Sequence, residues 1–458
     1  MFQIDFTQPI HVHFIGIGGI SMSGLAEILL DRHFTVSGSD RSPSAITEHL
    51  SSLGAKIACP QSAANVTDDI DCFVYTAAIS PDNPEWIAAS ASKKPMLTRA
   101  QLLGQIMSHY PESIAIAGTH GKTTSTSMMS MLLLESDQKP TISVGGILDA
   151  IHSNVHVGDS DRFVAEACEY TNSFLEFYPK YSVILNIEAE HLDFFKDLDD
   201  IRRSFKRFAE NTADKGLLVI NGEINDWQSL VADVKSDVQT YGFDDSCDWY
   251  PSQISYDHFG CASFIPHFRQ QTLPLIRLHV PGRHNIGNAL SVLAVAHRMG
   301  LSEEEIREGF AKFHGADRRF QYKGKFHGAT VIDDYAHHPT EIRASLAAAK
   351  NYPHKRIVVV FQPHTYTRTK AFLEDFADAL SAADQVILAD IYAAREQDIY
   401  GVSSLDIKKR LDAAGVDCLY FPSFEEIEDY LKKNSIDGDL LITMGAGNIV
   451  QVGEDLLR

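Results

Sequence analysis

The sequence of 458 residues lacks several patterns that would place a protein in a class at once. It has six cysteines but no CxxC pair, which gives no zinc signature and suits a reducing compartment. Its longest apolar runs, such as "RIVVVF", have the length of a strand and are too short to span a bilayer. No basic region precedes an apolar stretch at the N-terminus, so a signal peptide is not expected. These absences predict a cytoplasmic protein without membrane insertion.

Positive charge is also scarce, with 40 Lys and Arg against 61 Asp and Glu and a formal net charge of −21. This balance argues against nucleic acid as a partner, because backbone phosphates need a cationic surface. An anionic ligand must therefore be held by local devices such as helix N-termini, single cationic side chains or metal ions.

The length predicts about three domains, and short apolar runs alternate with helical patterns throughout the chain. This alternation indicates the α/β class with parallel sheets. From the strand rhythm we place a Rossmann-like domain at 1–105, a central P-loop ATPase-like domain at 106–316 and a second Rossmann-like domain at 317–458. Within the central domain, the stretch 240–270 is expected to form antiparallel strands at an edge.

A phosphate loop is predicted where the strand 113–118 turns into a helix. Gly118, Gly121, Lys122 and Thr123 lie at this turn, where backbone N–H groups and a lysine can hold the phosphates of ATP and a hydroxyl can reach Mg²⁺. The strict pattern has a further glycine where this chain has Ile116. The alternative is a chance glycine turn with an exposed lysine.

A second glycine-rich turn comes about a hundred residues earlier. Gly16, Gly18 and Gly19 follow a strand, but Ser21 stands where a dinucleotide fingerprint has its third glycine. Asp40 ends the next strand, where such folds place an acid that binds ribose. NAD, another nucleotide diphosphate and a purely structural turn all remain open.

Polar side chains gather at the predicted ends of further strands. Glu166 and Glu169 follow one strand and His191 another, which could place metal ligands at the edge of the phosphate loop. Isolated surface charges are the alternative reading. Asn285 and Asn288 share a face of a helix's first turn, where capping is an equally good explanation.

The last third of the chain adds a cluster of cationic, acidic and imidazole groups at strand ends: Arg318, Arg319, Asp333, Asp334, His337, His338, His364 and Arg368. The chain shows no Ser-His-Asp order and no nucleophile elbow. The chemistry indicated is phosphoryl transfer with charge stabilisation, without a covalent intermediate on the protein.

The segments "GTHGKTT", "EACEY", "NIEAEHLD", "PGRHNIGNAL", "DRRF", "DDYAHHPTE" and "FQPHTYTRT" together resemble the Mur ligases of peptidoglycan synthesis. The resemblance covers nearly the whole chain. It is strongest to the member that joins L-alanine to UDP-N-acetylmuramate through an acyl phosphate, releasing ADP and phosphate. It implies a cytoplasmic enzyme of cell-wall synthesis, and we expect a monomer or weak homodimer.

The resemblance also implies roles for named residues. The UDP-sugar would lie against Gly16, Gly18, Gly19, Ser21 and Asp40. ATP would be bound by Gly118, Thr119, His120, Gly121, Lys122, Thr123, Thr124, Asn285, Arg319 and Asp334. The catalytic set would be Lys122, Glu166, His191, Asn285, Asn288, Arg319 and Asp334. Mg²⁺ would be held by Thr123, Glu166 and His191, and the amino acid by His338, His364 and Arg368.

Three positions depart from the pattern of the family. Phe205 stands where many sister ligases carry a carbamylated lysine, so we expect no such modification. Thr365 replaces a commoner arginine, and Cys168 a commoner acidic residue. Thr365 leaves the recognition of the amino-acid carboxylate open.

Other functions remain to be separated. A recycling ligase that attaches a preformed tripeptide to the same UDP-sugar is the nearest alternative. A folate polyglutamate ligase would have no use for the first domain. A nucleotide-dependent oxidoreductase would explain "GIGG" but would leave Lys122 and Thr123 idle, and a non-catalytic switch would not need the cluster in the third domain.

Overall fold

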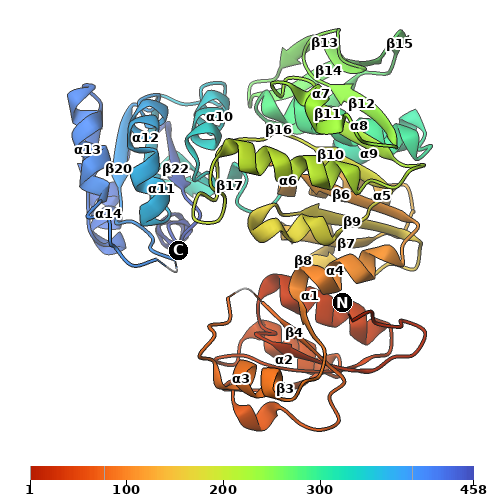
Figure 1. Ribbon diagram of the computed structural model, residues 1–458. Helices are drawn as coiled ribbons and strands as arrows, with labels where there is room; N and C mark the ends of the chain where they lie inside the picture. Colours follow the sequence, from red (N-terminus) through yellow and green to blue (C-terminus); the bar gives the residue numbers. More distant parts are fainter. Residues whose placement is uncertain (1, 77, 395) are drawn as a thin grey trace. The chain divides into compact units, whose positions relative to one another are not determined.

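The computed structural model describes residues 2–76, 78–394 and 396–458 (Figure 1). The chain divides into two compact units, of which the first runs to Glu188 and includes Asp199–Thr240. The second comprises Ala189–Leu198 and Tyr241–Arg458. The apolar run "DCFVYTAA" at 71–78 predicts a strand, and its residue Ala77 lies outside the described residues.

The first unit begins with a five-stranded sheet in the order β3-β2-β1-β4-β5, in which every pair is parallel. This confirms the parallel sheet predicted for the N-terminal part. The strands are β1 (His11–Ile15), β2 (Thr35–Ser39), β3 (Lys56–Ala58), β4 (Cys72–Tyr75) and β5 (Met96–Thr98). The helices are α1 (Ile20–Asp31), α2 (Ala45–Ser52), η1 (Ala63–Asn65), α3 (Pro84–Ala91) and α4 (Arg99–Ser108).

A buried carboxylate organises this sheet beside the first glycine turn. Glu85, which is 0% exposed, accepts hydrogen bonds from the Ser39 hydroxyl at 2.6 Å and from the Ser62 N–H at 2.9 Å. The imidazole of His13 lies 2.7 Å from the same carboxylate. Such bonds compensate the cost of burying the carboxylate, and they fix the end of β2 where the turn is anchored.

The second sheet of the first unit has the order β12-β11-β10-β6-β9-β7-β8. Its strands are β6 (Glu112–Ala117), β7 (Thr141–Leu148), β8 (Ser153–His156), β9 (Arg162–Ala167), β10 (Tyr181–Ile184), β11 (Leu217–Asn221) and β12 (Asp237–Tyr241). Its helices are α5 (Lys122–Glu135), η2 (Asp149–Ile151), η3 (Tyr170–Glu176), α6 (Leu198–Glu210) and α7 (Trp227–Val231). Because β6 is parallel to both β9 and β10, their carboxyl ends share one edge.

The two sheets of the first unit are joined where α1 lies against β8. A Cβ atom added to Gly24 would stand 2.1 Å from Cγ2 of Val155, so only glycine allows this approach. The side chain of Asn154 donates to the carbonyl of Ile20 at 3.2 Å. A close contact of the α1 backbone at Gly24 with β8 therefore connects the N-terminal sheet to the central one.

The second unit contains the antiparallel strands expected within 240–270. β13 (Trp249–Tyr256) pairs antiparallel with β14 (Cys261–Phe268), which pairs antiparallel with β15 (Gln271–Thr272) and β16 (Ile276–Pro281). Two helices follow, α8 (His284–Arg298) and α9 (Glu303–Lys312).

The C-terminal sheet has the order β17-β18-β22-β19-β20-β21, parallel except for β17. Its strands are β17 (Gln321–Phe326), β18 (Ala329–Asp334), β19 (Arg356–Phe361), β20 (Gln385–Leu388), β21 (Asp417–Tyr420) and β22 (Asp439–Met444). The helices are α10 (Pro339–Ala349), α11 (Tyr366–Ala371), α12 (Leu373–Leu380), α13 (Ser404–Ala413), α14 (Phe424–Asn434) and α15 (Val450–Leu456).

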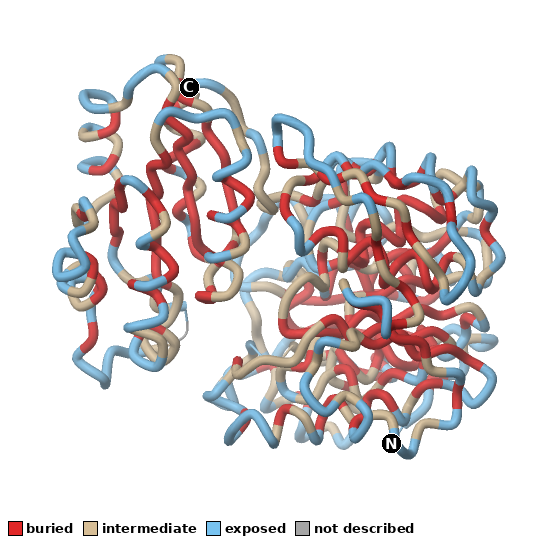
Figure 2. The backbone as a smooth tube through the Cα atoms, turned by 90° about the horizontal axis from the view of Figure 1, so that it is seen from above, coloured by how far each residue is buried: buried red, intermediate tan, exposed pale blue. Residues whose placement is uncertain are grey.

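The four inner strands of this sheet, β18, β22, β19 and β20, are buried on both faces, as the red tube in Figure 2 shows. Along β19, Ile357, Val359 and Phe361 belong to one apolar cluster, whereas Val358 and Val360 belong to the other. Alternate side chains of a strand point to opposite faces, which is why the apolar run "RIVVVF" is continuous. The predicted α/β class is confirmed in both units.

Among the described residues, no helix is long and apolar enough to cross a membrane. All six cysteines are free thiols.

Candidate active site

The predicted phosphate loop connects β6 to α5. Gly118 has φ +153°, and a Cβ there would stand 2.8 Å from Cβ of Leu185, while Gly121 at the N-cap of α5 has φ +83°. Both positions need glycine because L side chains rarely adopt such a backbone. The loop therefore presents the first turn of α5, where N–H groups have no partner inside the helix.

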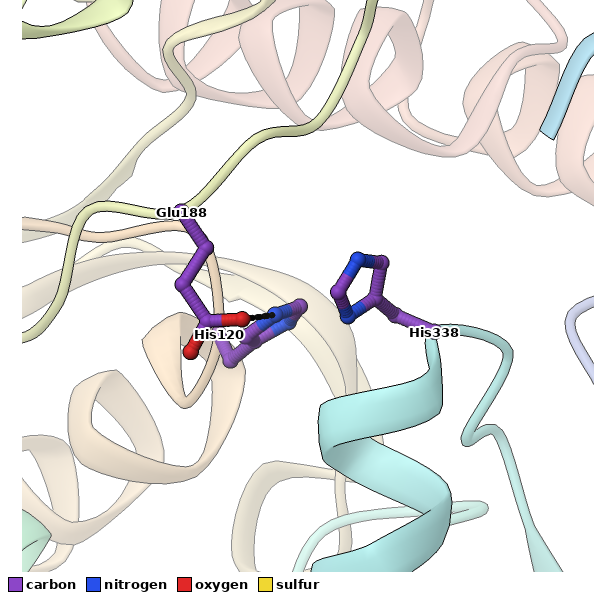
Figure 3. A group of neighbouring side chains, drawn as sticks. All are labelled: His120, Glu188 and His338. Carbon is purple, nitrogen blue, oxygen red and sulfur yellow. Dashed lines mark ion pairs between the residues drawn. The ribbon is translucent and has the colours of Figure 1, made fainter. Parts of the chain in front are cut away.

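Asn186, for which no role was predicted, fixes the loop from the end of β10. Its side-chain amide accepts from the His120 N–H at 2.7 Å and donates to the His120 carbonyl at 3.0 Å. The Thr119 hydroxyl accepts from the Glu188 N–H at 2.9 Å. In addition, Nε2 of His120 lies 3.5 Å from the Glu188 carboxylate (Figure 3). The only sequence signal for Asn186 was its place at a strand end.

Lys122 folds back over its own loop. Its Nζ donates to the Glu169 carboxylate at 2.9 Å and to the Thr119 carbonyl at 3.1 Å. Burial alone would lower the pKa of Lys122, but the Glu169 carboxylate outweighs it and raises this pKa above its ordinary value. Lys122 is therefore cationic, and Glu169 is its counter-ion.

Thr123 and Glu166 meet as predicted. The Thr123 hydroxyl donates to Oε2 of Glu166 at 3.0 Å, and the Gly145 N–H donates to the same atom at 2.9 Å. A hydroxyl and a carboxylate in contact are oxygen ligands of the kind that Mg²⁺ prefers, so this pair fits the ion. His191, the third predicted ligand, belongs to the second unit and remains a prediction.

Cys168 lies close to this pair without adding a reactive group. Burial raises the pKa of its thiol to about 11, which keeps it protonated. On α6, Phe205 is fully buried and packs edge-on against Phe174 with ring centroids 5.1 Å apart. Its neighbour Lys206 instead forms a surface ion pair with Asp233 at 2.6 Å.

The first glycine turn is tied to the end of β2. The N–H groups of Gly16 and Ile17 both donate to the Ser39 carbonyl at 2.9 Å, and the Gly18 N–H donates to the Asp40 carboxylate at 2.8 Å. Gly19 is the N-cap of α1 and makes no side-chain cap hydrogen bond. Asp40 thus contacts the turn directly, and Ser21 is exposed on the first turn of α1.

Asn285 and Asn288 form a buried amide ladder on α8. The Asn285 amide donates to the Pro281 carbonyl at 2.8 Å and accepts from the Asn288 amide at 3.0 Å. The N-cap of α8 is Arg283, without a side-chain cap bond. Helix capping, the alternative explanation for these residues, is therefore wrong.

The two adjacent arginines at the start of the C-terminal part, Arg318 and Arg319, make different contacts. Arg318 donates to the Asp333 carboxylate at 2.9 Å and to the carbonyls of Gly445 and Gly447 at 2.8 and 3.1 Å, so it holds backbone in place. Arg319 lies over the ring of Tyr335 and 3.9 Å from Glu341. Its guanidinium makes few contacts, which favours a ligand role for Arg319 rather than Arg318.

Asp334 is buried at the end of β18. It accepts hydrogen bonds from the Ser345 hydroxyl and from the Ala336 N–H, the latter at 3.0 Å. Burial raises the pKa of Asp334 to about 6 despite these bonds and the charge of Arg319. The group is thus a carboxylate that titrates close to neutral pH.

The three residues predicted to hold an amino acid lie on α10, α11 and the segment before α11. His338 is the N-cap of α10 and accepts from the Thr340 N–H at 3.3 Å. His364 lies 2.9 Å from a guanidinium nitrogen of Arg368. Burial, with the charge of Arg368, lowers the pKa of His364 to about 4, so this imidazole is neutral at pH 7.

Arg368 makes a buried ion pair that was not predicted. Its Nε and Nη2 donate to Oε1 of Glu190 at 3.1 and 2.8 Å, and both side chains are at most 10% exposed. Burial would raise the pKa of Glu190, but Arg368 holds this pKa down at about 2. The partners are 178 residues apart in sequence, and no local pattern pointed to Glu190.

Thr365 precedes this helix in an unusual conformation, with φ +66° and ψ +145°. Its hydroxyl accepts from the Arg368 N–H, and its carbonyl accepts from the Thr369 hydroxyl at 2.7 Å. A β-branched residue at positive φ is strained and needs support from its surroundings.

Comparison with known families covers most of the chain. The family model described as Mur ligase family, catalytic domain matches residues 11–111. The Mur ligase middle domain matches residues 116–296, and the Mur ligase, glutamate ligase domain matches residues 318–447.

Relatives of known name match the whole chain. The UDP-N-acetylmuramate–L-alanine ligase of Agathobacter rectalis is 61% identical over 458 residues, covering 100% of both chains. The ligase of the same name from Lachnospira eligens is 55% identical, again over 100% of both.

Two solved structures also resemble the chain over 98% of both lengths. The UDP-N-acetylmuramate-alanine ligase of Thermotoga maritima has a TM-score of 0.82 at 29% identity. The murein peptide ligase of Psychrobacter arcticus has a TM-score of 0.71 at 23% identity, which shows the shared fold alone.

Proposed function

The chain belongs to the Mur ligase family, and on that premise we propose that it joins L-alanine to the carboxylate of UDP-N-acetylmuramate while ATP becomes ADP and phosphate. The observation that carries this proposal is identity of 61% and 55%, over the full length, to ligases of that name. The tripeptide-recycling ligase is not favoured, since the murein peptide ligase is only 23% identical.

The proposed reaction has two steps. The substrate carboxylate attacks the γ-phosphorus of ATP, which forms an acyl phosphate and releases ADP. The amine of L-alanine then attacks the acyl carbon, and the tetrahedral intermediate expels phosphate and leaves an amide. Neither step needs a covalent bond to the protein, which agrees with the absence of an activated nucleophile among the described site residues.

Lys122 is proposed to stabilise the transferred phosphoryl group. In this structure its Nζ is held by Glu169 and by loop carbonyls, a short distance from the N–H groups of α5 that would take phosphate oxygens. The ATP loop Gly118, Thr119, His120, Gly121, Lys122, Thr123 and Thr124 would bind the phosphates, with Asn285, Asn288, Arg319 and Asp334 completing the site.

Mg²⁺ is proposed as the cofactor with ATP, held by Thr123, Glu166 and His191. The Thr123–Glu166 contact of 3.0 Å supports the first two ligands. When bound, the ion would neutralise charge on phosphate oxygens. The glycine turn of α1, with Ser21 and Asp40, is proposed to bind the UDP-sugar rather than NAD.

His338, His364 and Arg368 are proposed to bind L-alanine. We further propose the domain limits 1–105, 106–316 and 317–458, action in the cytoplasm, and a monomer or weak homodimer.

Phosphate release by the purified protein tests the function. With ATP, Mg²⁺ and UDP-N-acetylmuramate, turnover is expected only when L-alanine is added. Turnover only with the L-Ala-D-Glu-diamino-acid tripeptide would assign the recycling reaction instead. Oxidation of NADH, followed at 340 nm, without phosphate release would point to an oxidoreductase. If the folded protein releases no phosphate under any of these conditions, the proposal is contradicted.

A further inference from the structure

The second unit contains a small cavity beside the Glu190–Arg368 ion pair. About 290 Å³ of space, part of it open to solvent, is lined by residues that include Glu190, Thr365, Thr367, Arg368, Phe372 and Glu396. The lining offers both acidic and cationic groups, as a zwitterion requires.

The guanidinium of Arg368 has little capacity left for a ligand. An arginine has five N–H groups. Nε–H and one Nη2–H donate to Oε1 of Glu190, and Nη1 donates to Nδ1 of His364 at 2.9 Å and to the His364 carbonyl at 3.1 Å. One Nη2–H remains, so Arg368 cannot bind a substrate carboxylate through two parallel bonds while Glu190 stays in place.

Glu190, in contrast to Arg368, has hydrogen-bonding capacity left for a ligand. Its Oε1 accepts from Arg368 twice and from the His191 N–H at 3.1 Å. Across residues 2–76, 78–394 and 396–458, Oε2 of Glu190 has no hydrogen-bond partner, and it is not among the fully buried unpartnered atoms, so it reaches open space. A held carboxylate with one free oxygen at the wall of a cavity is an acceptor for a cationic donor.

We propose that Glu190 binds the ammonium group of the amino-acid substrate through Oε2, an inference that rests on the proposed ligase function. The remaining Nη2–H of Arg368 and the hydroxyls of Thr365 and Thr367 then receive the substrate carboxylate. Arg368 has two tasks: it orients Glu190 and contributes one donor at the other end of the zwitterion. The threonine at position 365 fits this division, since it supplies a neutral donor where a second guanidinium would compete for Glu190.

The cavity lining favours this assignment over a site for a lone anion. Among the described residues of the lining, Glu190 and Glu396 contribute carboxylates and Arg368 contributes a guanidinium. Glu396 is already engaged, because its Oε2 accepts from the Thr367 N–H at 2.8 Å. An incoming anion without an ammonium group would add a negative charge beside these two carboxylates, whereas a zwitterion adds no net charge.

The test compares Glu190→Gln with Glu396→Gln, which removes the engaged carboxylate of the same cavity. KM for L-alanine should rise about tenfold to a hundredfold in Glu190→Gln, the loss expected for a hydrogen bond to a charged group. It should change no more than about threefold in Glu396→Gln. KM for ATP and the half-saturating Mg²⁺ concentration should stay within about twofold in both variants.

L-Lactate, which carries a hydroxyl in place of the ammonium group, separates the two ends of the substrate. Its inhibition constant in Glu190→Gln should be equal to or lower than that of the wild type, because the variant loses only the contact to the ammonium end and removes a negative charge from the cavity. If Glu190→Gln does not fold, Glu190→Asp keeps the charge, and KM for L-alanine should still rise several-fold with inhibition by L-lactate unchanged.

Three results would overturn the inference. A lower KM for L-alanine with tighter L-lactate binding would make Glu190 a competitor of the substrate carboxylate. If KM for L-alanine and the inhibition constant of L-lactate rise by the same factor in Glu190→Gln, Glu190 only positions Arg368. A changed half-saturating Mg²⁺ concentration would make Glu190 a metal ligand. A wild type that is inactive with L-alanine would instead contradict the proposed function, and the inference with it.

Discussion

At the scale of single residues, the site is defined by charges whose partners lie far away in sequence. Lys122 and Glu169 are 47 positions apart, and Arg368 and Glu190 are 178 apart. The phosphate loop itself could be predicted, because the glycines, the lysine and the helix start are adjacent in sequence. The ion pairs could not, since they depend on which strand ends and loops meet in space.

The pair Lys122–Glu169 gives a prediction with a built-in control. Lys122→Ala should reduce phosphate release about 10²–10³-fold and should also lower the free energy of unfolding by about 3 kcal/mol, because Glu169 is 1% exposed and loses this cation. Adding Glu169→Gln to that variant should restore much of the stability but none of the activity. Denaturant titrations with parallel rate measurements check both. A Lys122→Ala variant with unchanged stability and rate would contradict the ion pair and the role of Lys122.

The raised pKa of Asp334 predicts how the free energy of unfolding changes with pH. Because its pKa of about 6 lies above the ordinary 3.8, the folded chain keeps a proton that the unfolded chain has lost between pH 4 and 6. The free energy of unfolding therefore falls as the pH rises through this window, by at most about 3 kcal/mol. Asp334→Asn should remove this decline and leave the protein more stable at pH 7.

Denaturation at several pH values between 4 and 7.5 measures this effect. Asp333→Asn is the comparison, because it removes the carboxylate charge that faces Arg318 at 2.9 Å, and stability at pH 7 should fall rather than rise. An unchanged slope in Asp334→Asn would show that Asp334 is not the titrating group.

At the scale of elements, the strands with continuous apolar runs and the antiparallel strands within 240–270 were predicted, whereas β7 was not. β6, β10, β18 and β19 are buried on both faces, and their sequences show it. β7 was missed because "TISVGGIL" contains two adjacent glycines, which disfavour a strand on propensity alone. An added Cβ at Gly145 would stand 2.4 Å from the Glu166 carboxylate, so that carboxylate would have to move.

Substitutions at the contact between α1 and β8 measure how much this contact contributes to the stability of the first unit. Gly24→Ala should lower the free energy of unfolding by about 1–3 kcal/mol, because its Cβ would meet Val155 at 2.1 Å. Val155→Ala in the same chain should recover part of this loss. Gly287→Ala on α8, where the nearest atom would be 3.7 Å away, should be neutral or slightly stabilising in the same thermal unfolding assay. Equal effects at both glycines would contradict the close approach.

At the scale of the whole molecule, two glycine turns open α1 and α5 after parallel strands, and the proposed function gives each a different nucleotide. The turn of α1 contacts Asp40 and lacks a lysine, which suits a UDP-sugar that is held but not cleaved. The turn of α5 contains Lys122 and the Thr123–Glu166 pair, which suits phosphoryl transfer. One chain thus brings a carboxylate and its activating phosphate donor to the same reaction.

The most direct test follows oxygen from the substrate carboxylate. UDP-N-acetylmuramate is labelled with ¹⁸O in both carboxylate oxygens and incubated with ATP and Mg²⁺. L-Alanine and the L-Ala-D-Glu-diamino-acid tripeptide are added in equal amounts, and the masses of the products are measured by mass spectrometry. The account predicts UDP-N-acetylmuramoyl-L-alanine together with phosphate that contains one ¹⁸O atom. Unlabelled phosphate would contradict the acyl phosphate, and a tripeptide product would contradict the assignment of L-alanine.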